Sequence, residues 1–198
     1  YWLVPHFEKM LYDNALLSKL YLHGYQLTQS GLYRRICEET LDYVLREMTD
    51  LQGGFYSAQD ADSEGEEGKF FVWTPQEIRD VLGEEDSRIF GDFFGVTEGG
   101  NFEGNSILNR RPNEGQFAEQ HGISLEELIT LLTRSKQKLL AVRDQRIHPL
   151  LDDKVLAGWN GLMITALAKA AALFAECRYK EAADRAADFI LQAMCADG

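Results

Sequence analysis

The sequence contains a repeat of itself, and this repeat limits the possible folds more than any other feature. At an offset of 146 residues, positions 10–48 fall on positions 156–194 without a gap. The matched pairs include Asn14 with Asn160, Tyr33 with Tyr179, and Met48 with Met194. An ungapped match of this length indicates one structural unit used twice.

Each copy is predicted to be a helical hairpin. The first helix, over residues 7–27 and again over 154–174, is apolar around most of its circumference, as expected for a helix enclosed on all sides. The second helix carries a one-sided apolar stripe, made by Ile36, Leu41, Val44, Leu45 and Met48 in one copy and by Ala183, Ala187, Ile190, Leu191 and Met194 in the other. An enclosed helix followed by an amphipathic one predicts an all-α fold with concentric layers, either an α/α toroid or a solenoid.

The segment between the copies has its own start signals. Thr74-Pro75-Gln76-Glu77 and Ser124-Leu125-Glu126-Glu127 are capping boxes, and they predict helices to about residues 82 and 142. A further helix is predicted over 87–94, and a short β-hairpin or ordered loop before Thr74. The expected organisation is one domain with a hairpin unit 6–49, a loop and insertion 53–123, a helix 124–142 and the repeated hairpin unit 152–195.

The composition of the chain bears on its binding partners and on its cellular location. Lys plus Arg number 20 and Asp plus Glu number 32, so the net charge of −12 disfavours nucleic acid. Residues 155–175 are long enough to span a bilayer but are rich in Ala and Gly, so we interpret them as a buried helix rather than a membrane segment. Three sparse cysteines predict reduced thiols and a cytoplasmic location. The chain does not begin with Met, which suggests a fragment.

Polar residues gather where the two apolar helices begin. His6, Glu8 and Lys9 open the first copy, and Asp152, Asp153 and Lys154 open the second, followed by Trp159 and Asn160. One interpretation is that the carboxylates Glu8, Asp152 and Asp153 stabilise the positive ends of the two helices, and the other is that the whole group faces a ligand at the mouth of the helical layer. For a single residue the first interpretation is favoured, and for the group the second.

Two polar turns are further candidates. Residues 60–68 hold five carboxylates, with aromatic runs on both sides. A calcium loop is disfavoured because its twelfth position is Phe71, where the bidentate glutamate belongs. A solvated turn and a site for a hydroxyl-rich ligand are evenly matched interpretations. The turn over 99–105, with Asn101, Glu103 and Asn105, lacks the Lys-Ser or Lys-Thr of a phosphate-binding loop.

The same segments resemble a known family. Val4-Pro5-His6-Phe7-Glu8-Lys9-Met10-Leu11-Tyr12-Asp13-Asn14, Ser57-Ala58-Gln59-Asp60-Ala61-Asp62-Ser63-Glu64-Gly65, Gly100-Asn101-Phe102-Glu103-Gly104, Leu151-Asp152-Asp153-Lys154 and Trp159-Asn160-Gly161-Leu162 resemble the thioredoxin domain-containing proteins related to spermatogenesis-associated protein 20. The resemblance implies a thioredoxin-like domain followed by an (α/α)6 toroid similar to six-hairpin glycosidases and N-acylglucosamine 2-epimerases. This chain matches only the middle of that toroid, so the thioredoxin-like domain is an implied partner in the full-length protein.

Carbohydrate binding or processing follows from this likeness of fold alone. Hydrolysis needs two carboxyl groups, which Asp60 or Asp62 with Glu8 or Asp153 would supply. Epimerisation needs histidines, of which only His6 lies in a matching motif. The alternative function is a non-catalytic scaffold that docks the thioredoxin-like domain. The residues expected to bind substrate are Lys9, Tyr12, Glu64, Trp73, Asn101, Glu103, Asn105, Trp159 and Asn160, and neither metal nor cofactor is expected.

Overall fold

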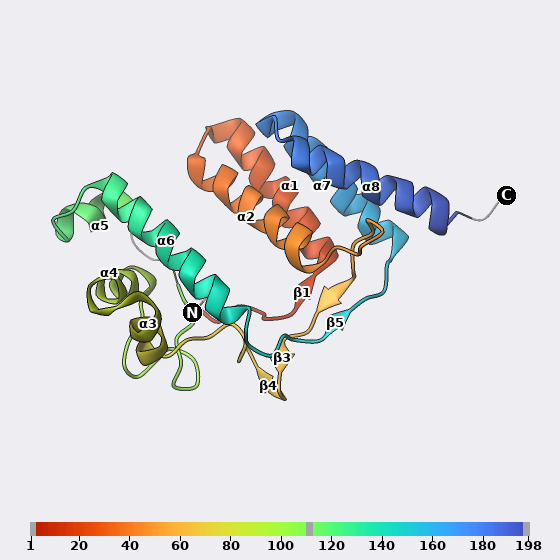
Figure 1. Ribbon diagram of the computed structural model, residues 1–198. Coiled ribbons are helices and arrows are strands. Elements are labelled where there is room, and N and C mark those ends of the chain that lie inside the picture. Colours follow the sequence, from red (N-terminus) through yellow and green to blue (C-terminus); the bar gives the residue numbers. More distant parts are fainter. Residues whose placement is uncertain (1–2, 110–112, 196–198) are drawn as a thin grey trace. The chain divides into compact units, whose positions relative to one another are not determined.

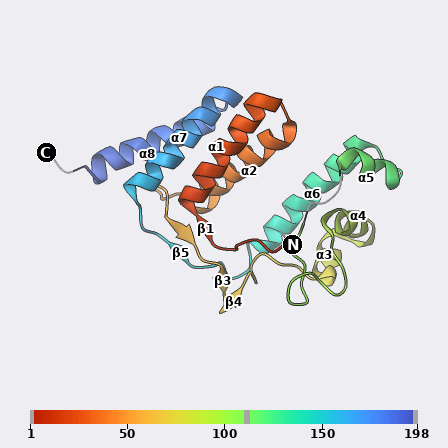
Figure 2. The ribbon, with the colours of Figure 1, turned by 180° about the vertical axis from the view of Figure 1, so that it is seen from behind.

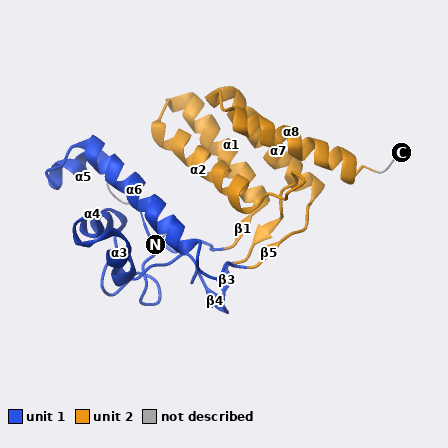
Figure 3. Ribbon diagram, viewed as in Figure 1, with its two compact units in different colours: residues 1–7, 61–149 blue, residues 8–60, 150–198 orange. Residues whose placement is uncertain are grey.

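The computed structural model describes residues 3–109 and 113–195, and these residues are mostly helical (Figure 1). The chain divides into two compact units (Figure 3). Unit 1 comprises residues 1–7 and 61–149, and unit 2 comprises residues 8–60 and 150–198. Both copies of the predicted repeat lie in unit 2, and the segment between them forms most of unit 1. Residues 110–112 of the predicted insertion lie outside the described residues.

The repeat is confirmed to the residue. Helix α1 (Leu11–Thr28) and helix α2 (Gly31–Glu47) form the first hairpin, and α7 (Ala157–Phe174) and α8 (Cys177–Ala193) form the second. All four helices of the two copies begin and end at positions related by the same 146-residue offset. The turns also match, because Gln29 (φ 54°) and Ala175 (φ 58°) are equivalent residues in the left-handed region.

The starts predicted for the first helices, residues 7 and 154, are wrong by three to four residues. Residues before α1 and α7 are extended because they join a sheet made of β1 (Lys9–Met10), β2 (Ala58–Gln59) and β5 (Leu151–Asp152). Strand β2 is central and antiparallel to both neighbours, pairing Met10 with Ala58 and Ala58 with Asp152. The sheet therefore fixes the beginnings of α1 and α7 next to each other.

Helices α1 and α7 are parallel neighbours, and both views show them side by side (Figures 1 and 2). The Tyr12 and Trp159 rings near their beginnings are 4.8 Å apart, and the Tyr25 and Phe174 rings near their ends are 5.7 Å apart. The N-terminal ends of α1 and α7 contact each other, and so do their C-terminal ends, so the two helices run in the same direction. Helices α2 and α8 cover them as the amphipathic partners, through Leu41, Val44, Ala183 and Ala186 among others.

The expected enclosure of the first helices on all sides is not found in the described structure. Leu20 on α1 is 63% exposed. Helix α7 is long and apolar enough, by length and composition alone, to cross a membrane, and 33% of it is buried. Each of the two helices therefore buries one face and leaves another apolar face open.

An extended segment between the hairpins is bound by a buried asparagine. Asn160 is completely buried, and its Oδ1 accepts a hydrogen bond from the Phe55 N–H at 2.8 Å while its Nδ2 donates to the Phe55 carbonyl at 2.9 Å. Nδ2 also donates to the Leu156 carbonyl at 3.1 Å. These bonds satisfy backbone groups that would otherwise be buried without partners.

Unit 1 contains a second helical cluster and two small hairpins. Its helices are α3 (Pro75–Leu82), α4 (Glu84–Phe94), α5 (Glu114–Gln120) and α6 (Leu125–Arg143), and its strands are β3 (Asp62–Ser63) and β4 (Glu66–Glu67). Both predicted capping boxes, at Thr74 and Ser124, are confirmed. Helix α4 starts three residues before the predicted Ser87, and α5, capped by Asn113, was not predicted.

Thiol reactivity tests the core of unit 2. Cys37 is buried and its Sγ lies 3.4 Å from the Ser18 carbonyl, whereas Cys177 and Cys195 are exposed. Burial raises the pKa of the Cys37 thiol to about 12, so almost no thiolate is present at neutral pH. We expect a disulfide reagent to titrate two thiols in the folded protein and the third only after denaturation. Rapid reaction of all three in the native state would contradict this core.

The repeat provides a matched pair of asparagine substitutions. Asn160→Ala leaves two buried backbone groups of Phe55 without partners, at about 1–3 kcal/mol each, so we expect a loss of roughly 2–4 kcal/mol in the free energy of unfolding. The equivalent Asn14 donates to the Met10 carbonyl at 2.8 Å, so Asn14→Ala is expected to cost only about 1 kcal/mol. Urea unfolding followed by circular dichroism measures both, and equal losses would contradict the assignment.

Candidate functional site

Two tight turns of the same design project carboxylates in unit 1. In the turn between β3 and β4, Glu64 and Gly65 have φ of 55° and 79°. In the turn between Phe102 and Asn105, Glu103 and Gly104 have φ of 48° and 80°. Two consecutive residues with positive φ are the pattern of a two-residue hairpin turn, for which glycine at the second position is favourable. Both turns therefore present a glutamate followed by a glycine.

The surrounding contacts hold each turn in place. Asn101 fixes the second turn because its Oδ1 accepts from the Ile107 N–H at 2.7 Å and its Nδ2 donates to the Ile107 carbonyl at 3.0 Å. Below the first turn, Gly68 (φ 75°) donates to the Ala61 carbonyl at 3.0 Å, and a Cβ at this glycine would lie 2.7 Å from the Phe7 ring. A side chain at position 68 is excluded both by its backbone conformation and by this ring.

A cavity of about 500 Å³ lies between these turns and the segments around them. Its volume falls in the usual range for small-molecule sites. Five glutamates and two cations contribute to its wall, together with phenylalanine rings and uncharged polar groups. The lining residues are Ser63, Glu64, Glu66, Glu67, Lys69, Phe70, Val72, Thr74, Glu77, Phe102, Glu103, Asn105, Gln145, Arg146 and Ile147.

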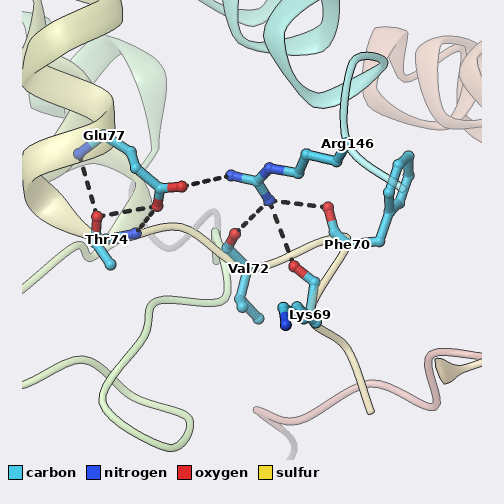
Figure 4. Close-up of polar contacts among 6 residues, drawn as sticks. All are labelled: Lys69, Phe70, Val72, Thr74, Glu77 and Arg146. Carbon is cyan, nitrogen blue, oxygen red and sulfur yellow. Dashed lines mark hydrogen bonds and ion pairs between the residues drawn. The ribbon is translucent and has the colours of Figure 1, made fainter. Parts of the chain in front are cut away.

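Arg146 organises one wall of this cavity (Figure 4). Its Nη1 donates to the Phe70 carbonyl at 3.0 Å and to the Val72 carbonyl at 2.7 Å. Its Nη2 donates to the Glu77 carboxylate at 3.1 Å. The other oxygen of Glu77 accepts from the Thr74 N–H at 2.7 Å, so a single glutamate joins the helix cap to the arginine. The guanidinium therefore connects the end of α6 to the strand-like segment before α3.

The environment of Arg146 is partly desolvated. Its guanidinium carbon lies 4.1 Å from the centre of the Trp73 ring, and Trp73 itself is 3% exposed. Burial lowers the pKa of Arg146, as does the neighbouring Arg143, while Glu77 raises it. An arginine stays charged under these conditions, so the partial burial makes its carbonyl and carboxylate partners more important.

Lys69 is the other cation of the cavity. Its Nζ lies 3.0 Å from Oε1 of Glu66 and 3.4 Å from Oε2 of Glu64. These carboxylates raise the pKa of Lys69, the hydrogen bond with Glu66 being the largest contribution. Both partners are solvent-exposed, so the ion pairs are weak and a ligand can displace them at small cost.

The structure sorts the predicted residues of unit 1 into three groups. Glu64, Glu103 and Asn105 line the cavity together. Asn101 and Trp73 have structural roles, because the amide of Asn101 binds Ile107 and the Trp73 ring is buried under Arg146. The exposed His6 and Asp62 belong to the same unit but are not part of the cavity lining.

The remaining predicted residues lie in unit 2, near the beginnings of α1 and α7. Tyr12 and Trp159 contact each other edge to face. Lys9 lies in β1, and Glu8 directly before it is half-buried. Asp60 and Asp153 are exposed, and they follow β2 and β5, which pair with each other. Asn160 is buried against Phe55 and has a structural role.

Sequence reasoning missed Arg146 and the role of Glu77. The sequence identifies Glu77 only as the residue three positions after the cap in a capping box, and the structure shows its second carboxylate oxygen bound to Arg146. Arg146 follows the end of α6 in a segment without a motif. The sequence shows only an arginine in a polar turn before Ile147, and this pattern does not indicate which groups the arginine binds.

Comparisons with known proteins place the chain in a group of relatives. It is 35% identical to spermatogenesis-associated protein 20 of Homo sapiens, over an alignment covering 98% of this chain and 28% of the relative. The chain is homologous to a segment of this protein. The mouse protein of the same name is 34% identical over 84% of this chain, and an uncharacterized protein of Caenorhabditis elegans is 32% identical over 96%.

The similarity covers only part of each relative. The chain spans between 24% and 29% of the length of these relatives. No protein-family model matches the chain. The name spermatogenesis-associated protein 20 refers to a tissue process and states no reaction, so the chemistry of the site is argued from its residues.

Replacing Arg146 tests the wall of the cavity. Arg146→Lys keeps the charge but replaces the planar guanidinium, whose two terminal nitrogens reach the carbonyls and the carboxylate separately, by a single nitrogen, so we expect a loss of about 1.5–3 kcal/mol in the free energy of unfolding. Arg134→Lys on α6 is the matched control, because Arg134 is 54% exposed and forms a surface ion pair with Asp86, and the substitution should change stability by less than about 1 kcal/mol. Chemical denaturation measures both, and similar losses would contradict the anchoring role.

Proposed function

We propose that this chain is part of an α/α toroid and that the cavity of unit 1 binds a neutral, hydroxyl-rich ligand of the sugar class. The observation that carries the ligand proposal is the cavity itself, whose wall combines carboxylates from two Glu-Gly turns with the Phe70 and Phe102 rings. The toroid proposal is supported by the repeated hairpins and by the parallel packing of their first helices.

The composition of the wall selects the ligand class. Carboxylates such as those of Glu64 and Glu103 accept hydrogen bonds from hydroxyl groups, and aromatic rings offer apolar faces to the C–H groups of a sugar ring. Five carboxylates and two cations give the wall an excess of negative charge, which disfavours phosphorylated or acidic sugars. Neutral sugars therefore fit this wall better than anionic ones.

Of the two reactions considered, glycoside hydrolysis fits the chain better than epimerisation. Hydrolysis requires two carboxyl groups on opposite sides of the bond that breaks, one as an acid and one as a base or nucleophile. Within unit 2, Asp60 with Glu8 or Asp153 is the candidate pair for these roles, and none of the three residues lines the cavity of unit 1. Epimerisation beside a carbonyl relies on groups that titrate near neutrality, and His6 is the only histidine in a matching segment.

Calorimetric titration with a panel of neutral mono- and disaccharides tests this proposal. We expect saturable heat for at least one sugar, and a loss of affinity of about tenfold or more in Glu103→Gln, because a carboxylate that accepts hydroxyl hydrogen bonds is neutralised. Glu119→Gln, an exposed residue of α5 away from the cavity lining, is the matched control and should bind like the native protein. His6→Ala and Asp62→Ala change residues outside the cavity lining, so both variants should bind the sugar like the native protein.

A titration without any binding heat would favour a non-catalytic role for the chain. If no sugar produces heat in the native protein, the ligand proposal fails and the alternative is a non-catalytic scaffold for a thioredoxin-like domain. That alternative takes its support from the length of the relatives, of which the chain spans 28% in the human protein. The cytoplasmic location stays a prediction.

A further inference from the structure

The cavity of unit 1 carries more negative charge than its own cations neutralise. Five glutamates and two cations line it, which leaves the wall with a formal charge of −3. Arg146 is engaged by Glu77, whose Oε1 accepts from the guanidinium at 3.1 Å. The single charge of Lys69 is shared between Glu64 and Glu66, whose oxygens lie 3.4 and 3.0 Å from its Nζ. The two cations of the wall are therefore already paired with three of its five carboxylates.

The other two carboxylates of the wall are those of Glu67 and Glu103. Both residues line the cavity and both are exposed. Within residues 3–109 and 113–195, neither carboxylate takes part in an ion pair. They come from different segments, Glu67 from β4 and Glu103 from the turn between Phe102 and Asn105. A ligand that enters the cavity therefore meets two carboxylates without a cation of the protein beside them.

The distribution of these carboxylates favours an organic cation over a metal ion. Among the described residues, no three His, Cys, Asp or Glu side chains gather closely enough to hold a metal ion. The charges are instead spread along a wall that also contains the Phe70 and Phe102 rings. Aromatic faces attract ammonium groups as well as the C–H groups of a sugar ring. The wall therefore complements a hydroxyl-rich ring that carries one positive charge.

We propose that the cavity of unit 1 prefers amino sugars with a free, protonated amine over neutral sugars of the same shape, and that Glu67 and Glu103 determine this specificity. The inference rests on the proposed function, because it requires that a sugar ring enters this cavity. Neutral sugars stay ligands, and the amine adds to their affinity. Because both carboxylates are exposed, the added attraction is modest and is screened by salt. Acetylation of the amine removes the positive charge and with it the advantage.

Calorimetric titration of the 198-residue chain with matched sugar pairs tests this preference. Each pair is a hexose and its 2-amino derivative, such as glucose with glucosamine and galactose with galactosamine. The measurement is made at about pH 6, where an amine with the pKa of an α-amino group is protonated. We expect the amino sugar to bind about three- to tenfold more tightly at low salt. The advantage should fall to about twofold or less at about 1 M salt, where the Debye length is about 3 Å. N-acetylglucosamine should show no such advantage.

Substitutions then assign the preference to the two carboxylates. Glu67→Gln removes a charge at nearly constant side-chain size, so the ratio between the dissociation constants of the hexose and its amino derivative should decrease. The double variant Glu67→Gln/Glu103→Gln should reduce this ratio to about one, because both unpaired charges are gone. Glu119→Gln, an exposed substitution on α5, is the matched control and should keep the native ratio. Circular dichroism should show native helix content in every variant.

The possible outcomes separate this inference from the proposed function. Equal affinities for a hexose and its amino derivative at low salt, or an amine preference that persists in the double variant, would overturn the inference and leave the sugar cavity in place. Heat from amino sugars alone would uphold the preference and change the proposed ligand from neutral to cationic. Ethanolamine has the charge without the ring, and binding as tight as that of glucosamine would overturn the inference in favour of a simple cation site. Absence of heat with every sugar, neutral or charged, would contradict both proposals.

Discussion

The hydrogen bonds between Asn160 and the backbone of Phe55 hold unit 2 together. Phe55 is fully buried, and so are the neighbouring residues Ser57 and Ala58 of the same extended segment. A buried extended segment is stable only if its N–H and C=O groups have partners, since each unpaired group costs about 1–3 kcal/mol. The amide of Asn160 and the strands β1 and β5 provide these partners. Through them the loop after the first hairpin becomes the connection between α1 and α7.

Unit 1 uses an arginine for the same purpose. Residues around Phe70 and Val72 have carbonyl groups that no regular sheet satisfies, and the guanidinium of Arg146 binds both. A charged donor gives stronger hydrogen bonds than a neutral one, and Glu77 balances its charge. The cavity lies beside this contact, so the stability of its wall and the position of its carboxylates depend on the same side chain. Replacing Arg146 would therefore affect both the stability of unit 1 and the candidate ligand site.

The repeat shows how one sequence pattern acquires two environments. The helices of the two hairpins begin and end at equivalent positions because local signals are sufficient for helix length and turn position. Their exposure differs because burial depends on which neighbour is present. The open apolar faces of α1 and α7 are consequences of this packing. They also explain why α7 is apolar enough to resemble a membrane span while remaining only partly buried.

The helical class, the repeated hairpins and both capping boxes can be predicted from the sequence, because helix periodicity and capping act over a few neighbouring residues. It also located the two acidic turns, since glycine-rich polar segments interrupt regular structure. The packing of distant segments shows that Glu64 and Glu103 line the same cavity, that Trp73 and Asn160 have structural roles, and that Arg146 organises one wall of the cavity. These outcomes depend on contacts between residues far apart in the chain, for which no local pattern exists.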